Sequence, residues 1–483
     1  MVVIVAHANH DLAVAPTLPQ MKSVAAGVAA SHPATARAGL QILQDGGTAA
    51  DAAVAAVLAT CAAETIFTGL GGGGFATYFE AATGEVTCLD FFVAAPGLDG
   101  DAEPGPMISV DVFFGGLPQV YSIGGASAAV PGVPAGCGEV HRRWGRLPWA
   151  EVVAPAFALA KTGVPTPEAH ARTLDACAPA LAYGEGAPIY TPNGRRLQGG
   201  ELLFHPGLAT AMEALAAVGP SIFYTGDLAP VIVDSVRAAG GSLGPRDLAE
   251  YRVLETPVDR ATLAGHQVRA RHDLNRVVDT IGALPADLSR PQRALGLAEA
   301  LRDQGRQRVG ETTNVSVVDA EGNACVITTT LGLGSGVWLP GLGINLNSML
   351  GEGELIIGDL RPGDRMPSNM CPLVVIDPDG RLAVAAGSAG ASRIRTALID
   401  TLLGVLVDGL DMAAATGRPR FHVVGDTVHA EDGYPRDELA ALDNAGWKIN
   451  QWSGLNHYFG GVTAVGQAGA AGDPRRAGVG LLL

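Results

Sequence analysis

Long hydrophobic runs are missing from this 483-residue chain. No stretch approaches the ~18 uninterrupted apolar residues typical of a membrane-spanning helix, so we expect no transmembrane segment. The N-terminus has no basic residues ahead of its apolar run, and that run is too short for a secretory signal. The sequence therefore predicts a cytoplasmic protein without a membrane partner.

Basic residues and cysteines are also scarce. Lys and Arg number 32 against 48 Asp and Glu, and the net charge of −16 disfavours nucleic acid or an anionic membrane as a partner. The six cysteines show no paired spacing, so neither a disulfide framework nor a zinc site is expected. No His-Glu-x-x-His, EF-hand or phosphate-loop pattern occurs. We expect no metal and no other cofactor.

Apolar residues are plentiful, at 48% of the chain, and 65 glycines indicate close backbone approach within a large core. No internal repeat or linker stands out. Strands that face each other with helices outside them predict an α+β sandwich. The patterns predict helices over residues 34–45, 49–62, 149–162, 201–218 and 291–308, and strands over 75–79, 86–92, 315–319 and 324–331.

The glycine-rich segment at residues 69–74 satisfies a Gly-x-Gly-x-x-Gly pattern. A dinucleotide site needs that pattern directly after a strand. Here it follows a predicted helix, so we do not expect a nucleotide to bind. His422 and His457 are interpreted as structural or surface residues rather than general bases.

Two adjacent threonines, Thr312 and Thr313, stand at the head of a predicted strand deep inside the chain. One interpretation is a β-hairpin with threonines chosen for strand propensity. The other is a nucleophile, because a threonine hydroxyl becomes reactive when its own α-amine removes the proton. That amine is free only if the bond between Glu311 and Thr312 is cut.

The order of the motifs around this strand favours the second interpretation. A glycine-rich hairpin exit follows at residues 332–336, and Met366-Pro367-Ser368-Asn369 and Gly387-Ser388-Ala389-Gly390-Ala391-Ser392-Arg393 follow further on. Together with Gly145-Arg146-Leu147-Pro148-Trp149 and Arg418-Pro419-Arg420-Phe421-His422, this order resembles the γ-glutamyltransferase family of N-terminal nucleophile hydrolases, over almost the whole chain. Its pocket looks like that of the homologues in 4-alkyl-L-proline natural-product pathways.

The resemblance implies a four-layer αββα sandwich. It implies a large fragment of residues 1–311 and a small fragment of residues 312–483, which begins with the nucleophile. Both fragments would build one domain and stay together as a heterodimer after self-cleavage. The partner it implies beyond this is a small-molecule substrate.

The resemblance also assigns roles in catalysis. Thr312 matches the nucleophile, and Thr330 matches the threonine that hydrogen-bonds the nucleophile. Gly390 and Ala391 match the paired glycines whose N–H groups form the oxyanion hole, where each donor stabilises the developing negative charge by roughly 3–4 kcal/mol. Alanine in place of the second glycine keeps the N–H group but narrows backbone freedom.

Residues that bind the substrate depart from the family pattern. Phe92 stands where the family has an arginine that holds the α-carboxylate of the glutamyl group, and an aromatic ring cannot replace a bidentate guanidinium. Glu352 alone keeps the acidic character of its counterpart. At the other predicted binding positions, Gly332 replaces an Asn or Glu, Met349 replaces a Gln or Glu, and the family's carboxylate-binding Ser-Ser pair becomes Ser368-Asn369.

A working nucleophile in an altered pocket favours a hydrolase of secondary metabolism over a glutathione-processing enzyme. We expect hydrolytic cleavage of a carbon–carbon bond, with removal of an oxalyl-type fragment from a 4-alkyl-L-proline precursor. A γ-glutamyltransferase or glutathione hydrolase, a cephalosporin-acylase-like amidohydrolase and a non-catalytic binding protein remain as alternatives.

Overall fold

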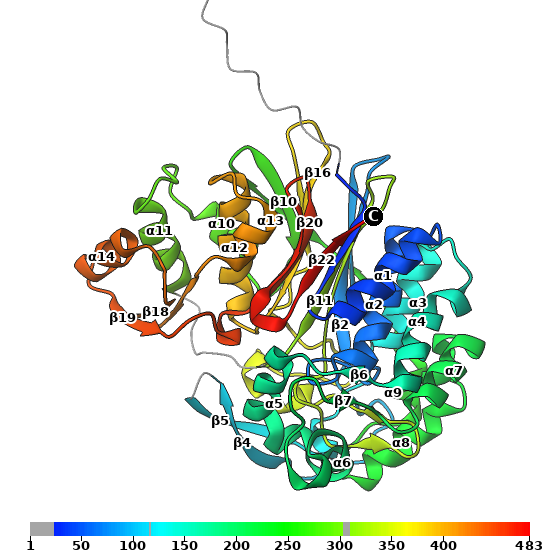
Figure 1. Ribbon diagram of the computed structural model, residues 1–483. Coiled ribbons are helices and arrows are strands. Elements are labelled where there is room, and N and C mark those ends of the chain that lie inside the picture. Colours follow the sequence, from blue (N-terminus) through cyan, green and yellow to red (C-terminus); the bar gives the residue numbers. More distant parts are fainter. Residues whose placement is uncertain (1–23, 115–116, 303–309) are drawn as a thin grey trace, which may run out of the picture.

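Two antiparallel β-sheets lie face to face at the centre of the computed structural model, which describes residues 24–114, 117–302 and 310–483 (Figure 1). The seven-stranded sheet has the order β22 (Val479–Leu482), β1 (Gly27–Ala30), β11 (Thr313–Val318), β12 (Ala324–Thr330), β2 (Gly73–Glu80), β3 (Glu85–Phe91), β8 (Leu254–Thr256). The six-stranded sheet has the order β21 (Gly469–Gly472), β20 (Gly461–Gly466), β16 (Leu382–Ala389), β15 (Leu373–Ile376), β10 (His266–Arg271), β9 (Val258–Leu263). Strands β11 and β12 of the first sheet pack against β16 of the second sheet. The predicted nucleophile, Thr312, directly precedes β11.

Helices cover the outer face of each sheet, which confirms the predicted four-layer αββα sandwich (Figure 1). Helix α2 packs on β11 and β12, while α12 packs on β16. The helices are α1 (Pro33–Gln44), α2 (Ala49–Ala63), α3 (Val133–Trp144), α4 (Trp149–Thr162), α5 (Glu168–Leu181), α6 (Ala187–Tyr190), α7 (Leu208–Val218), α8 (Leu228–Ala238), α9 (Pro245–Ala249), α10 (Val277–Gly282), α11 (Gln292–Leu301), α12 (Arg393–Leu406), α13 (Met412–Gly417) and α14 (Arg436–Asn444).

Short strands complete the fold outside the two sheets. They pair as β4 (Ile108–Phe114) with β5 (Leu117–Ile123), β6 (Val164–Pro165) with β7 (Leu202–Leu203), β13 (Trp338–Leu339) with β14 (Ile344–Asn345), and β17 (Phe421–Val424) with β18 (Thr427–Glu431) and β19 (Lys448–Trp452). Strand β5 of the β4–β5 hairpin carries Tyr121, whose hydroxyl bonds Glu352, a residue that lines the same pocket as Thr312.

Helix α2 packs against the central strands β11 and β12. Thr48 caps it by accepting a hydrogen bond from the N–H of Asp51, whose carboxylate accepts from the N–H of Thr48 in return. All fifteen residues of the helix are buried, and most are alanines, whose small side chains let the helix lie close to the sheet. Asp319, at the turn after β11, accepts from the N–H of Ala49 at 3.0 Å and ties the helix to that strand.

The predicted helix over 149–162 matches α4, whereas the predicted helix over 201–218 is wrong in its first half. Pro206 and Gly207 interrupt that segment, and Gly207 adopts a φ of 87°. Helix α7 therefore begins only at Leu208. The helix predicted over 291–308 is confirmed as far as Leu301, and residues 303–309 lie outside the described part of the chain.

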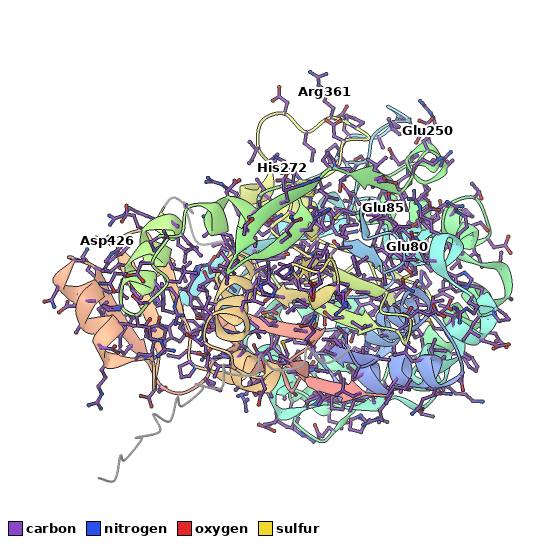
Figure 2. The ribbon with its side chains drawn as sticks, turned by 90° about the horizontal axis from the view of Figure 1, so that it is seen from above. Glu80, Glu85, Glu250, His272, Arg361 and Asp426 are labelled. Carbon is purple, nitrogen blue, oxygen red and sulfur yellow. The ribbon has the colours of Figure 1, made fainter. Side chains whose placement is uncertain are left out.

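Several exposed charged side chains lie at the edge of the molecule. Figure 2 shows Glu250, Arg361 and Asp426 at its outer rim, and all three are exposed. The six cysteines are all buried and free. Within the described ranges, no helix combines the length and apolar character that crossing a membrane requires.

Candidate active site

Thr312 lies directly before the first residue of β11, a central strand of the seven-stranded sheet. Its side chain is buried. The end of the neighbouring strand β12 lies alongside, because Thr313 pairs with Thr329. The pairing of β11 with β12 thereby brings the last residue of β12, Thr330, next to the bond that precedes Thr312.

The Thr330 hydroxyl donates a hydrogen bond to the carbonyl oxygen of Glu311. It also accepts a hydrogen bond of 2.8 Å from the N–H of Gly332, which fixes its orientation. A donor on a carbonyl oxygen stabilises the negative charge that develops there when a nucleophile attacks the carbonyl carbon. This hydrogen bond polarises the Glu311 carbonyl, at the bond where the sequence predicts cleavage.

The Glu311 side chain points into the protein. Its Oε2 lies 2.6 Å from Nη1 of Arg476, and both side chains are almost fully buried. The same Nη1 lies 3.5 Å from the carbonyl oxygen of Thr312. Arg476 thus holds both residues of the predicted cleavage site, although no sequence motif pointed to it.

Glu64, at the end of α2, anchors the head of β11. Its carboxyl oxygens accept hydrogen bonds from the hydroxyls of Thr313 and, at 2.7 Å, Thr35. Burial raises the pKa of Glu64 to about 7, against the lowering effect of those two hydrogen bonds and of Arg476. This carboxyl group holds the residue next to Thr312 in place.

The turn after β16 contains the two predicted oxyanion-hole residues, and Ala391 lines the pocket that also contains Thr312. Gly390 has a φ of 121° and Ala391 a φ of 50°, so alanine occupies a left-handed conformation that costs on the order of 1 kcal/mol. Neither N–H donates to a main-chain carbonyl in the described ranges.

Tyr121 closes the side of the pocket beside Gly332. Its hydroxyl donates to Oε1 of Glu352 at 2.7 Å and lies 3.1 Å from the Ser348 hydroxyl. Gly332 has a φ of 65°, and a Cβ atom there would collide with the Tyr121 hydroxyl. Burial raises the pKa of Glu352 to about 8, so the carboxyl group is mostly protonated at pH 7.

Arg271 and its ion-pair partner Asp273 hold the loop that contains Ser368 and Asn369. The guanidinium donates to the carbonyl of Met370 at 2.9 Å and pairs with Asp273, which in turn accepts from the N–H of Ser368 at 2.8 Å. Arg271 is buried and its charge is paired with Asp273.

Phe92 lies in the hydrophobic core behind the site. Its ring centroid is 5.3 Å from that of Phe75, whose ring is covered by the Arg271 guanidinium. Phe92 is fully buried and does not line the pocket at Thr312. Phe92 is therefore not placed to contact a substrate in that pocket, contrary to the sequence prediction.

Most of the other predicted residues line one pocket: Glu311, Thr312, Thr330, Met349, Glu352, Ser368, Asn369 and Ala391, together with Gly310, Leu355, Met370 and Ile394. Gly332 and Gly390 are not among the residues that line it. Its free volume is about 20 Å³, room for about one water molecule. Gly310 and Glu311 form part of its wall.

Comparison with protein families agrees with this geometry. The family model for gamma-glutamyltranspeptidase matches residues 35–272 and 281–483. The chain belongs to the gamma-glutamyltranspeptidase family. It is therefore an N-terminal nucleophile hydrolase, an autoproteolytic enzyme with a threonine nucleophile.

Three proteins similar in sequence to this chain match most of its length. The glutathione hydrolase proenzyme of Escherichia coli (strain K12) is 28% identical over 93% of this chain and 90% of its own length. The glutathione hydrolase proenzyme of Bacillus subtilis (strain 168) is 25% identical over 87% and 85%. The acylase ACY 1 proenzyme of Pseudomonas sp. (strain SE83) is 28% identical over 87% of each chain.

Solved structures share the fold. Cephalosporin acylase from Bacillus halodurans superposes with a TM-score of 0.78, at 22% identity, over 99% of both chains. The structure of LmbA2991HD gives a TM-score of 0.77, at 21% identity, over 96% of this chain and 99% of that one.

Within this gamma-glutamyltranspeptidase-family site, three contributors escaped sequence reasoning: Arg476, Glu64 and Tyr121. Each lies far along the chain from Thr312: Arg476 contacts its carbonyl oxygen, Glu64 bonds the neighbouring Thr313, and Tyr121 bonds Glu352 of the same pocket. Arg475-Arg476 near the C-terminus, in a chain poor in basic residues, was the one signal available. Glu64 and Tyr121 sit in segments without any chemical motif.

Proposed function

We propose that Thr312 is the nucleophile and that the chain cuts itself between Glu311 and Thr312. The observation that carries this is the Thr330 hydroxyl on the Glu311 carbonyl oxygen, beside the buried Thr312. Attack by the Thr312 hydroxyl on that carbonyl gives an ester, which water hydrolyses. The products are residues 1–311 and residues 312–483, associated as a heterodimer.

In turnover, the new α-amine of Thr312 accepts the hydroxyl proton and the oxygen attacks the substrate carbonyl. The N–H groups of Gly390 and Ala391 would hold the oxyanion. Thr330 loses its acceptor on Glu311 when that residue leaves, and its hydroxyl becomes free to bond the nucleophile. One set of groups thus serves both self-cleavage and catalysis.

The pocket wall argues against efficient γ-glutamyl transfer. No arginine or lysine is among the described residues that line it, and Phe92 supplies no charge where the family has an arginine. Gly332 leaves no room for the larger polar side chain found there in relatives, because Tyr121 occupies that space. Glu352, mostly protonated at neutral pH, is a weak partner for an ammonium group.

The proton on Glu352 suits the cleavage of a carbon–carbon bond. In this step the Thr312 oxygen bonds to the carbonyl carbon, the carbon–carbon bond breaks, and its electron pair goes to the leaving carbon. That carbon takes the proton of Glu352, and water then hydrolyses the Thr312 ester. The proposed enzyme removes an oxalyl-type fragment from a 4-alkyl-L-proline precursor, in cytoplasmic secondary metabolism.

An amidohydrolase is the second candidate, because the acylase ACY 1 proenzyme is as similar in sequence as the glutathione hydrolases. The leaving group would then be an amine, which needs a proton in the same way. Glutathione hydrolysis comes next, and a non-catalytic binding protein is the candidate least supported by the assembled site.

A substrate panel tests the proposal. Purified enzyme is given an oxalyl-bearing 4-alkylidene-L-proline, a cephalosporin amide and γ-glutamyl-4-nitroanilide, with Thr312→Ala as the blank. We expect oxalate release from the first and turnover of the γ-glutamyl anilide at least ~10-fold slower, the value of one missing charge-assisted hydrogen bond. Preference for the cephalosporin amide would establish the second candidate, and preference for the anilide would establish a glutathione hydrolase.

A further inference from the structure

Glu64 bonds the strand that begins beside the proposed nucleophile. Its carboxyl oxygens accept hydrogen bonds from the hydroxyls of Thr313, the first residue of β11, and of Thr35 in α1. Successive side chains of a strand point to opposite faces of the sheet. The Thr313 side chain points toward the helices that cover the sheet, whereas Thr312 lines the pocket. Glu64 is not among the described residues that line that pocket, so it can act on Thr312 through Thr313 without touching a substrate.

The turn that follows this glutamate bonds the neighbouring strand. Its glutamate carbonyl accepts from the N–H groups of Phe67 and Thr68, at 2.8 and 3.1 Å. The Thr68 hydroxyl then donates to the hydroxyl of Thr329 at 2.9 Å. The Phe67 carbonyl accepts from the N–H of Leu331 at 3.3 Å. The turn thereby holds the residues on both sides of Thr330.

The pairing of β11 with β12 ends one residue short of the nucleophile. Its last pair is Thr313 with Thr329, and Thr312 lies just beyond it. Both members of that last pair are bonded by the turn after α2, one by Glu64 and the other by Thr68. A misplacement of about 1 Å between reacting groups can cost on the order of 100-fold in rate. The turn therefore controls the geometry that self-cleavage requires.

We propose that Glu64 is a positioning residue for self-cleavage, which holds the Thr312 hydroxyl in register with the Glu311 carbonyl. The inference rests on the proposed cleavage at that bond and adds which group outside the pocket sets its rate. An ionised carboxylate suits this role best, because both of its oxygens accept hydrogen bonds, whereas protonation turns one of them into a donor.

The charge of Glu64 gives the proposal a pH signature. The groups that face it are the hydroxyls of Thr35 and Thr313, the guanidinium of Arg476, and the thiol of Cys61 on its own helix. Burial raises the pKa of Glu64 to about 7 and that of Cys61 to about 12, so of these groups only Glu64 changes charge near neutral pH. Self-cleavage should slow as the pH falls through about 7.

The rate of self-cleavage tests the proposal without any substrate. The chain is labelled briefly by cell-free translation and diluted into buffers on either side of pH 7, and electrophoresis follows the fragment of residues 312–483. We expect Glu64→Ala to cleave at least ~10-fold more slowly than wild type in the alkaline buffer. Glu85→Ala, at an exposed position, is the control and should cleave at the wild-type rate.

Two conservative variants separate positioning from a loss of folding. Glu64→Gln stays neutral at every pH and should cleave without the change of rate near pH 7, while Thr68→Val should cleave more slowly at every pH and keep that change. If Glu64→Ala does not fold, the pH profile of Glu64→Gln decides. Wild-type rate in Glu64→Ala, or a wild-type pH profile in Glu64→Gln, overturns the inference. Absence of the fragment from wild type itself counts against the cleavage proposal instead.

Discussion

Single side chains around Thr312 explain why this pocket differs from that of a glutamyl-transferring relative. Gly332 has no side chain, and the Tyr121 hydroxyl lies where its Cβ would be while donating to Glu352. The carboxyl group of Glu352 is thereby buried and keeps its proton at neutral pH.

Restoring a larger residue at Gly332 should damage the fold. Asparagine there meets the Tyr121 hydroxyl at a φ of 65°, so Gly332→Asn should lower the free energy of unfolding by about 1–3 kcal/mol. Urea denaturation measures the loss. Gly353→Asn, where a Cβ meets open space, is the control and should change stability by less than ~0.5 kcal/mol. Equal effects at the two positions would contradict the close contact.

Glu352 should make stability depend on pH. Its pKa in the folded protein, about 8, lies above the ordinary value of 4.5, so the folded state holds a proton that the unfolded state releases. The stability contributed by that proton is complete below pH 4.5 and is lost as the pH rises through 8. In wild type, this group should make the free energy of unfolding fall by on the order of 1 kcal/mol per pH unit between pH 5.5 and 8. Glu352→Gln should remove that part of the slope.

The same substitution carries a kinetic readout. If Glu352 supplies the proton to the leaving carbon, kcat of wild type falls above pH 8, and Glu352→Gln loses activity at every pH. A variant with full activity and an unchanged pH profile would show that Glu352 is only part of the wall.

Secondary-structure elements place these side chains. Sequence patterns located β11, β12 and α2, because their hydrophobic periodicity, turn residues and caps are local. They failed over residues 201–218, where Pro206 and Gly207 end one element and begin another. Arg476, Glu64 and Tyr121 could not be found in this way, since each reaches Thr312 only through contacts that the sheet order creates.

The cap of α2 should matter for the site as well as for the helix. Thr48→Ala removes the acceptor for the N–H of Asp51 and the bond to the Trp144 carbonyl, so it should cost about 1–2 kcal/mol of unfolding free energy. Chemical denaturation provides the measurement. Thr83→Ala, in an exposed turn, serves as the control, and a loss no larger than that of the control would mean that α2 does not depend on its cap.

Both large sheets combine strands from the two proposed fragments. In the seven-stranded sheet β1, β2, β3 and β8 come from residues before Thr312, and β11, β12 and β22 from the rest. The six-stranded sheet likewise combines β9 and β10 with strands of the C-terminal part. Neither fragment can complete a sheet alone, and unpaired strand edges are unfavourable.

Cleaved protein should therefore behave as one particle. Its two fragments should co-elute in gel filtration even at high salt, because strand pairing and buried apolar surface are not screened as surface ion pairs are. Guanidinium chloride should separate them. Dissociation by salt alone would mean that ion pairs such as Arg293 with Asp408 hold the fragments together instead.

The intact mass of the purified protein, beside that of Thr312→Ala, tests the central claim most directly. We predict two wild-type species, with the masses of residues 1–311 and 312–483, and one full-length species in the variant. A single full-length chain in both samples, or a cut at another bond, would contradict Thr312 as the self-cleaving nucleophile.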